Sequence, residues 1–498
     1  MAWSVRPVSA LLVLAACPAG PDNNSSPASE ASTTSATDVG PTEPPPTDTT
    51  VTPDTTVPTV DPDTTLTTID PDTTLTTIDP DTTLDPTTTT TTPPDPVCGD
   101  GFVSDGEVCD DGNTVDGDCC SADCSVGPSE PGQVCWTVTF EGLKNGADRG
   151  VGVALDAGTD VYVAATVIDD VPGSDILVRR YDPGAVSQWT QQFDGGVNGT
   201  DIALAMAGDD AGFMIAVGRQ TTMQGMPSVM WLTKCTPTGQ TLWSTFDPGP
   251  VSGGGIALAD ASGEFVVVGS INQGGNNALV RRYDPNGSEL WTEVFSGPDG
   301  GTDIASGVAV DGAGNIIVAG REFTDAAAFN IWVQQYGPGG DAGWTASFDG
   351  PASGADWAND VAVDPDDDSV IVVGRVDVGG GFSDAWIRKY DAGGDELWTQ
   401  TFAGQGGMSD DAVAVAVAPG GDFAVTGQTF VADHSDIFVS KRDKDGDELW
   451  LRSFDGEQSS DDQPGDVAVA GDGSVVVIGT TAIVPMINSD VWLRKYSP

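Results

Sequence analysis

The segment Trp291-Thr-Glu-Val-Phe295 is one copy of a short motif, a Trp followed by a Phe and soon by a Gly, that the chain repeats seven times. The copies are Trp136–Phe140, Trp189–Phe193, Trp243–Phe246 (one residue shorter than the rest), Trp291–Phe295, Trp344–Phe348, Trp398–Phe402 and Trp450–Phe454. Successive Trp residues lie 53, 54, 48, 53, 54 and 52 positions apart. A period of about fifty residues indicates a propeller, a solenoid or another array of small units.

Four strand-like runs lie within each repeat. In one copy they are Asp303–Val310, Ile316–Gly320, Ile331–Tyr336 and Trp344–Phe348, separated by turns and a variable loop. β-branched and aromatic runs of this length, cut by clusters of Gly, Pro, Asn and Asp, are typical of strands, and the repeats show no helical periodicity. Seven units of four strands predict an all-β fold, a seven-bladed β-propeller over residues 136–498.

The two ends of the repeat region fall at different points of the repeat. The region begins with a Trp strand alone, Trp136–Phe140, and it ends after Val491–Tyr496 with no Trp strand following. We therefore expect the first strand to complete the last blade, because this pairing closes the ring and leaves no unpaired edge. An open solenoid would not require such a split.

The repeats resemble those of the seven-bladed propellers of secreted bacterial proteins. The matching segments are Val308-Ala-Val-Asp311, Arg281-Arg-Tyr-Asp-Pro-Asn-Gly287 and Leu290-Trp291. The spacing of Asp284, Gly287 and Trp291 is also similar to that of the docking motif of quinoprotein propellers. This resemblance implies that each Trp packs between neighbouring blades, where its burial with Phe would hold the ring together.

Acidic side chains outnumber basic ones by 75 to 19, which gives a formal net charge of −56. Such a surface repels phosphate backbones, so nucleic acid is not expected as a partner. The charge would keep the protein soluble, and it would also attract cations or basic partners. The few basic residues occur mostly as pairs in the third strand, such as Arg281-Arg282, and we expect them to bridge to acidic side chains on neighbouring strands.

Residues 1–16 have the features of a secretion signal: a positive charge, a short apolar run and small residues after it. The apolar run is too short to span a bilayer. It ends Leu14-Ala-Ala-Cys17, which resembles the bacterial lipoprotein box. The resemblance implies that Cys17 is diacylated and anchors the chain in the outer membrane, since two acyl chains together anchor stably. The alternative is an ordinary signal peptide that is cleaved after Ala16.

Residues 17–96, which begin with the lipidated Cys, are rich in Thr, Pro, Asp and Ser and contain almost no aromatic residues. A nine-residue unit, Asp-Pro-Asp-Thr-Thr-Leu-Thr-Thr-Ile, starts at Asp61 and Asp70 and begins again at Asp79. This composition buries too little apolar area to offset the entropy of ordering, so we expect a disordered, extended stalk. Its length suits a protein that faces the cell exterior.

Residues 97–135 hold six of the eight cysteines, and we expect these six to form disulfides: Cys98, Cys109, Cys119, Cys120, Cys124 and Cys135. Their setting, CGDG…GEVCDDGN…GDCCSADC, resembles the cysteine-rich repeat of large bacterial surface proteins. A unit of this size has too little core to fold unaided, so three disulfides would stabilise it. Six cysteines allow fifteen pairings, and only a bond between adjacent Cys119 and Cys120 is disfavoured, because its ring is strained.

Two groups of polar side chains could bind a cation. The first lies in the cysteine-rich module and offers the hard oxygen ligands that calcium prefers: Asp100, Glu107, Asp110, Asn113, Asp116 and Asp118. The second recurs at the start of the innermost strand of each repeat but the third, where it would crowd one rim of the central channel: Asp148, Asp201, Asp303, Asp356, Asp410 and Asp462. Both groups have a structural alternative, because Asp and Asn also form tight turns and accept backbone N–H bonds.

No catalytic constellation is visible in the sequence. The single His, His434, stands in a loop where we expect it to be solvated, and there is no nucleophile elbow or P-loop. We therefore expect a monomeric, non-enzymatic binding or scaffold module for an extracellular protein or glycan, with calcium as the one cofactor suggested. The alternatives are a propeller enzyme, either a quinone-dependent dehydrogenase or a glycan lyase or hydrolase, and an outer-membrane assembly factor.

Overall fold

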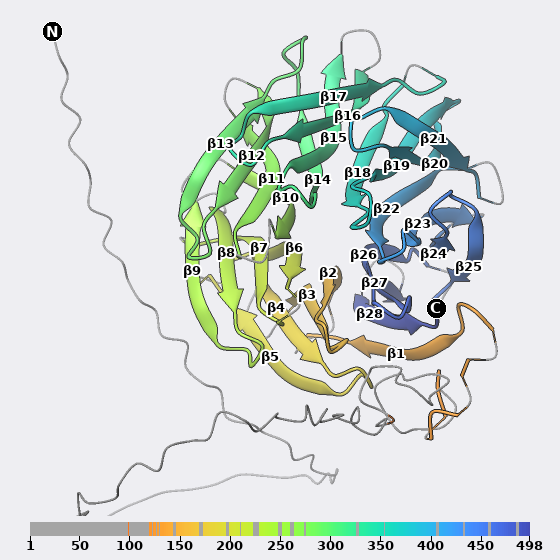
Figure 1. Ribbon diagram of the computed structural model, residues 1–498. Helices are drawn as coiled ribbons and strands as arrows, with labels where there is room; N and C mark the ends of the chain where they lie inside the picture. Colours follow the sequence, from red (N-terminus) through yellow and green to blue (C-terminus); the bar gives the residue numbers. More distant parts are fainter. Residues whose placement is uncertain are drawn as a thin grey trace, which may run out of the picture. The chain divides into compact units, whose positions relative to one another are not determined.

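The described part of the chain consists of strands and the turns that join them (Figure 1). The computed structural model describes Cys98, parts of residues 119–128, and residues 130–498 except for short loop segments. Within these ranges there is no helix, and so none long and apolar enough to cross a membrane. The predicted signal peptide and stalk lie outside the described residues.

Each of the first six blades is a four-stranded antiparallel sheet of consecutive strands. Blades one to three are β2 (Arg149–Leu155), β3 (Val161–Ile168), β4 (Ser174–Tyr181), β5 (Ser187–Phe193); β6 (Ile202–Gly208), β7 (Met214–Gln220), β8 (Val229–Cys235), β9 (Thr241–Asp247); and β10 (Val251–Leu258), β11 (Phe265–Asn272), β12 (Asn276–Tyr283), β13 (Glu289–Phe295). Blades four to six are β14 (Ile304–Val310), β15 (Ile316–Thr324), β16 (Ala328–Tyr336), β17 (Ala342–Phe348); β18 (Trp357–Val363), β19 (Val370–Gly379), β20 (Phe382–Tyr390), β21 (Glu396–Phe402); and β22 (Asp410–Val417), β23 (Phe423–Val431), β24 (His434–Arg442), β25 (Glu448–Phe454). The seventh blade is β26 (Gln463–Val469), β27 (Val475–Val484), β28 (Asn488–Tyr496) and β1 (Val134–Phe140).

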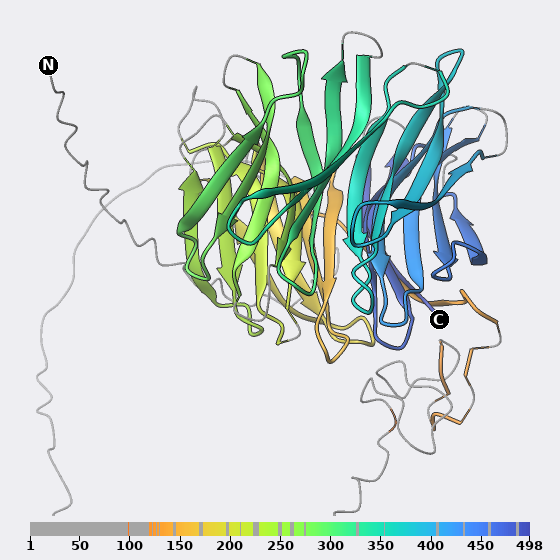
Figure 2. The same cartoon turned by 45° about the horizontal axis from the view of Figure 1, so that its top comes forward.

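The seven blades form a closed ring in which the first strand of each blade is innermost. The strands β2, β6, β10, β14, β18, β22 and β26 contact one another in that order, and β26 contacts β2 again. Figure 2 shows the blades side by side around the ring. The second strands, such as Val370–Gly379, begin with residues buried on both faces, which explains their unbroken apolar sequences. The predicted seven-bladed propeller is confirmed.

The first strand of the chain completes the last blade. β1 pairs antiparallel with β28, so that Trp136 lies opposite Lys495 and Phe140 lies opposite Val491. This is the pairing that the split repeat predicted. It gives β28 a neighbour on each side, so the two ends of the propeller seal the ring. The strand begins at Val134, two residues before the expected start of the propeller.

The repeated Trp residues dock on the turn of the next blade. Four indole Nε1 groups donate a hydrogen bond of 2.9–3.0 Å to a Pro carbonyl oxygen there, namely Trp136 to Pro183, Trp189 to Pro237, Trp243 to Pro285 and Trp291 to Pro338. Trp291 also covers Gly340, whose φ of +91° lies in the region that favours glycine. The remaining three Trp rings lie against turn glycines in the same way: Trp344 against Gly394, Trp398 against Gly446 and Trp450 against Gly132. Packing of the Trp residues between blades is confirmed.

A second aromatic layer lies deeper between the blades. The Phe of the motif contacts a Trp on the third strand of the next blade, with ring centroids 4.2–5.5 Å apart: Phe193 with Trp231, Phe295 with Trp332, Phe348 with Trp386 and Phe454 with Trp492. These four Trp side chains are at most 2% exposed. Each such pair contributes about 0.5–1.5 kcal/mol beyond its burial, so the repeats supply the cohesion between blades.

The basic pairs of the third strands form ion pairs with acidic side chains, as the sequence predicts. Arg180 pairs with Asp160, which directly precedes the neighbouring strand β3. Arg282 Nη2 lies 2.8 Å from Glu264 Oε2, which stands at the equivalent position beside β11. These side chains therefore neutralise charge within their own blade.

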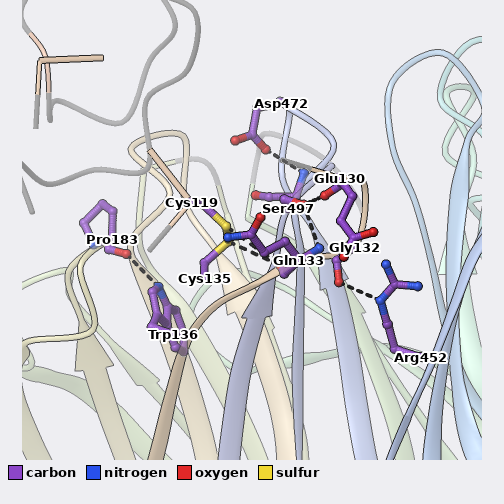
Figure 3. Close-up of a disulfide and its surroundings, with 11 residues drawn as sticks. Cys119, Glu130, Gly132, Gln133, Cys135, Trp136, Pro183, Arg452, Asp472 and Ser497 are labelled. Carbon is purple, nitrogen blue, oxygen red and sulfur yellow. Dashed lines mark hydrogen bonds between the residues drawn. A yellow bond between two sulfur atoms is a disulfide. The ribbon is translucent and has the colours of Figure 1, made fainter. Parts of the chain in front are cut away.

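Disulfides connect the N-terminal cysteines to one another and to the ring. The bonds between described residues are Cys98–Cys124 and Cys119–Cys135. Cys135 lies in β1, so the second bond ties the module to the closing strand (Figure 3). Cys120 is also disulfide-bonded, and its partner is therefore not the adjacent Cys119, as predicted. Cys109 lies outside the described residues.

The residues just before β1 contact Ser497 at the end of the seventh blade and β25 of the sixth blade (Figure 3). The Gln133 N–H donates to Ser497 Oγ at 2.9 Å, and the Ser497 N–H donates to the Gln133 carbonyl oxygen at 2.8 Å. Arg452 Nε donates to the Gly132 carbonyl oxygen at 3.0 Å. Because Gly132 lies on the Trp450 ring as other turn glycines lie on their Trp, this segment serves as the docking turn of the seventh blade.

Candidate functional site

The Asp residues that start the innermost strands are buried. The six predicted residues are at most 2% exposed. They are Asp148, Asp201, Asp303, Asp356, Asp410 and Asp462. Asp303 Oδ2 accepts the Gly297 N–H at 2.7 Å, and its Oδ1 accepts the Phe323 N–H at 2.9 Å. Of the two alternatives that the sequence left open for this group, the structure supports the structural one: these side chains fix loops, because their oxygens accept bonds from backbone donors.

The same Asp residues link neighbouring blades. The Asp303 N–H donates to the Asn276 carbonyl oxygen at 2.7 Å, and the Asp462 N–H donates to the Ser435 carbonyl oxygen at 2.8 Å. Ser435 Oγ donates in return to the Asp462 carbonyl oxygen at 3.3 Å. Each of these bonds joins the third strand of one blade to the start of the following blade, at what we call a blade junction.

Further acidic side chains gather at the first blade junction. Carboxylate oxygens of Asp175 in β4, Asp194 after β5 and Asp201 before β6 all lie within 4.8 Å of one another. Desolvation raises the pKa of Asp201, although its two backbone donors oppose the rise. The repeat creates this grouping, because the second Asp follows the first by 19 residues and the third follows the second by 7.

The sixth blade junction contains the only His of the chain. His434 Nε2 lies 3.2 Å from Asp436 Oδ1 and 3.8 Å from Asp455 Oδ1. The His434 side chain is 13% exposed, so the expectation of a solvated loop His is wrong. Sequence reasoning missed the group because it considered His434 alone. The available signal was the spacing from Asp436 to Asp455 to Asp462, which repeats the 19 and 7 residues of the first junction.

Two more Asp residues lie on innermost strands, in the fifth and seventh blades. Asp360 Oδ2 accepts the Val415 N–H at 3.0 Å, and Asp466 Oδ2 accepts the Val153 N–H at 2.9 Å, each from the next blade. Desolvation by the crowded strands raises the pKa of Asp360 to about 7 and the pKa of Asp466 to about 8. This acid pair can therefore take up or release protons near neutral pH. Neither Asp360 nor Asp466 was predicted as a site residue from the sequence.

The remaining predicted site residues lie outside the described residues. These are Cys17 and the six proposed calcium ligands Asp100, Glu107, Asp110, Asn113, Asp116 and Asp118. Lipidation and calcium binding therefore stay predictions from the sequence.

Comparison with known proteins gives one family match, over the N-terminal module. Residues 88–125 match a family described as a domain of unknown function (DUF4215). A search of curated proteins found no match to the chain. The family match covers most of the predicted cysteine-rich module and none of the propeller.

Several solved structures are similar to this chain at low sequence identity. The β-propeller domain of the Trilobed protease from Pyrococcus furiosus is 9% identical, with 71% of this chain and 94% of that chain covered and a TM-score of 0.42. The polysaccharide lyase Uly1 is 11% identical, with 70% of this chain and 90% of that chain covered and a TM-score of 0.43. Sqt1 from Chaetomium thermophilum is 12% identical, with 68% of this chain and 82% of that chain covered and a TM-score of 0.37. The chain itself is a seven-bladed β-propeller with disulfide-bonded cysteines on its N-terminal side.

Proposed function

We propose that this protein is a lipid-anchored binding or scaffold module of the outer membrane, whose propeller is held outward on the stalk and binds a basic extracellular protein. The observation that carries the proposal is the distribution of charge. The chain has a formal net charge of −56, and the described basic side chains of the propeller, apart from Arg149 and Lys444, are buried or half-buried.

Buried basic groups contrast with exposed acidic turns. Lys389 and Lys441 are 4% and 5% exposed, and Lys441 Nζ donates to the Gly473 carbonyl oxygen at 2.7 Å. Turn residues such as Asp395 and Asp445 are exposed. The outer surface therefore carries a negative field that would steer Lys- and Arg-rich partners toward it and would repel anionic ones.

The location is tested by labelling and by protease treatment of intact cells. Palmitate should label the full chain and should fail to label Cys17→Ser. Protease added to intact cells should remove the propeller. A labelled propeller that survives this treatment would contradict the outward orientation and would favour the periplasmic assembly factor.

The binding role is tested with a peptide of defined charge. A decalysine peptide should bind the purified chain at low ionic strength and dissociate as salt is added, whereas decaglutamate should not bind. Failure of decalysine to bind would overturn the basic-partner proposal. A quinone absorbance band in the purified protein would instead support the dehydrogenase alternative.

A further inference from the structure

The sixth blade junction brings together three metal-ligand atoms from two paired strands. His434 and Asp436 lie at the start of β24, and Asp455 directly follows β25. The two strands pair in this region, with Ile437 opposite Phe454. His434 Nε2, Asp436 Oδ1 and an Asp455 carboxylate oxygen consequently all lie within 4.8 Å of one another.

Asp436 provides a separate observation that points to a ligand. The residue Asp436 is only 8% exposed, and its Oδ1 atom has no hydrogen-bond partner among the described residues. That oxygen faces His434 Nε2 at 3.2 Å. A buried carboxylate is costly unless it is paired, hydrogen-bonded or bound to a metal, and a metal ion held between Asp436 and His434 would supply the missing partner.

The distances agree with the coordination shell of a small transition-metal ion. Ligands about 2.0–2.1 Å from a tetrahedral zinc ion are separated by about 3.3 Å. The two measured separations from His434 Nε2 are 3.2 and 3.8 Å. An imidazole nitrogen is a ligand for zinc and its neighbours, whereas calcium and magnesium prefer oxygen alone. The Asp455 side chain is 47% exposed, so an ion and a water ligand can enter from solvent.

We propose that His434, Asp436 and Asp455 form a binding site for a divalent transition-metal ion of the zinc type, completed by water. The bound ion would join the end of β25 to the start of β24, beside Asp462 of the seventh blade, and would stabilise the folded ring. The proposal does not depend on the nature of the propeller's partner.

The other blades supply internal comparisons. In the fifth blade Phe382 stands where His434 stands, Asp384 replaces Asp436, and Ala403 replaces Asp455. That junction keeps one carboxylate and lacks the other two ligands, so it should not bind the ion. Asp384→Asn is therefore a matched control for Asp436→Asn: it removes the same charge from the same strand position.

The experiment uses the full, untagged chain with its disulfides intact, after chelator treatment, in excess Mg²⁺ to occupy weak acidic sites. Zn²⁺ binding is measured by calorimetry, and the single imidazole is followed by NMR after ¹⁵N-His labelling. We expect one Zn²⁺ per chain, with a shift of the Nε2 resonance. Affinity should fall by about tenfold or more in His434→Gln and in Asp436→Asn, and should be unchanged in Asp384→Asn.

Three outcomes would overturn the site. They are the absence of Zn²⁺ binding in the wild-type chain, Zn²⁺ binding that leaves the imidazole resonances unmoved, and equal affinity in His434→Gln. Asp436→Asn could fail to fold, and His434→Gln, which alters a partly exposed side chain, keeps the test decisive in that case.

Discussion

At the scale of single residues, Asp303 and Asp360 show how the surroundings of a carboxyl group set its role. Asp303 accepts two backbone N–H bonds in a loop and is fully buried. Asp360 accepts a bond from Val415 of the next blade and has a raised pKa because the innermost strands desolvate it. The first residue therefore serves the loop structure, and the second is open to titration.

Replacing Asp303 with Ala should destabilise the fold, because it leaves the N–H groups of Gly297 and Phe323 without their acceptor. Each buried donor that loses its bond costs about 1–3 kcal/mol. Urea unfolding should therefore show a lower midpoint for Asp303→Ala, whereas Asp341→Ala, at an exposed turn position, should unfold like the wild type. Equal midpoints for the two variants would contradict the assigned role.

The acid pair predicts a pH dependence of stability. The native pKa values of about 7 for Asp360 and about 8 for Asp466 lie above the ordinary value of 3.8, so the folded state binds more protons than the unfolded state between these limits. The stability contributed by the two protonated groups is fully present below pH 3.8 and is lost as the pH rises through about 7 to 8.

The double variant Asp360→Asn/Asp466→Asn removes both titrating groups. It should gain stability relative to the wild type as the pH is raised from 4 to 9, measured as the difference in unfolding midpoint at each pH. Asp341→Asn serves as the control and should show no such trend. A difference that stays constant over this range would mean that the pair does not titrate in the folded protein.

Sequence reasoning went less far for single residues than for strands. The recurrence of Asp303 and its five equivalents was visible, but a sequence does not show which backbone donors will surround a carboxylate. For His434, a solvated loop position was predicted from the residues next to it in the chain. Its partner Asp455 becomes a neighbour only because β24 and β25 pair, so the junction could be recognised only by aligning the repeats.

At the scale of elements, the spacing of the motif decides which face of the strand each aromatic ring occupies. Side chains alternate along a strand, so Trp189 and Phe193, four residues apart, share the face that packs on the next blade. In the shortened copy Trp243 and Phe246 are three residues apart and must point to opposite faces. Accordingly Phe246 is 46% exposed, whereas Phe193 is 8% exposed.

This difference predicts unequal effects of the same substitution. Phe193→Ala should lower the free energy of unfolding by about 3–5 kcal/mol, because it removes a ring that packs on the buried Trp231. Phe246→Ala should change it by about 0.5 kcal/mol or less. Chemical denaturation of the two variants measures both values. Similar losses would show that the shortened strand buries its Phe.

At the scale of the whole molecule, the number of blades and the closure of the ring followed from the sequence, because both are consequences of a regular repeat. The split Trp strand predicted that β1 would pair with β28, and it does. The docking turn at Gly132 was not foreseen. It lies in the segment assigned to the cysteine-rich module, and only the contact with Trp450 reveals its role in the ring.

Hydrogen–deuterium exchange of the intact chain tests the closed ring most directly. In a closed ring, the paired amides of β1 and β28, such as those of Val138 and Leu493, should exchange as slowly as those of β4 and β5 in the first blade. The contradictory result would be fast exchange, at the rate of an unstructured peptide, in β1 and along the facing edge of β28 while β4 and β5 remain protected.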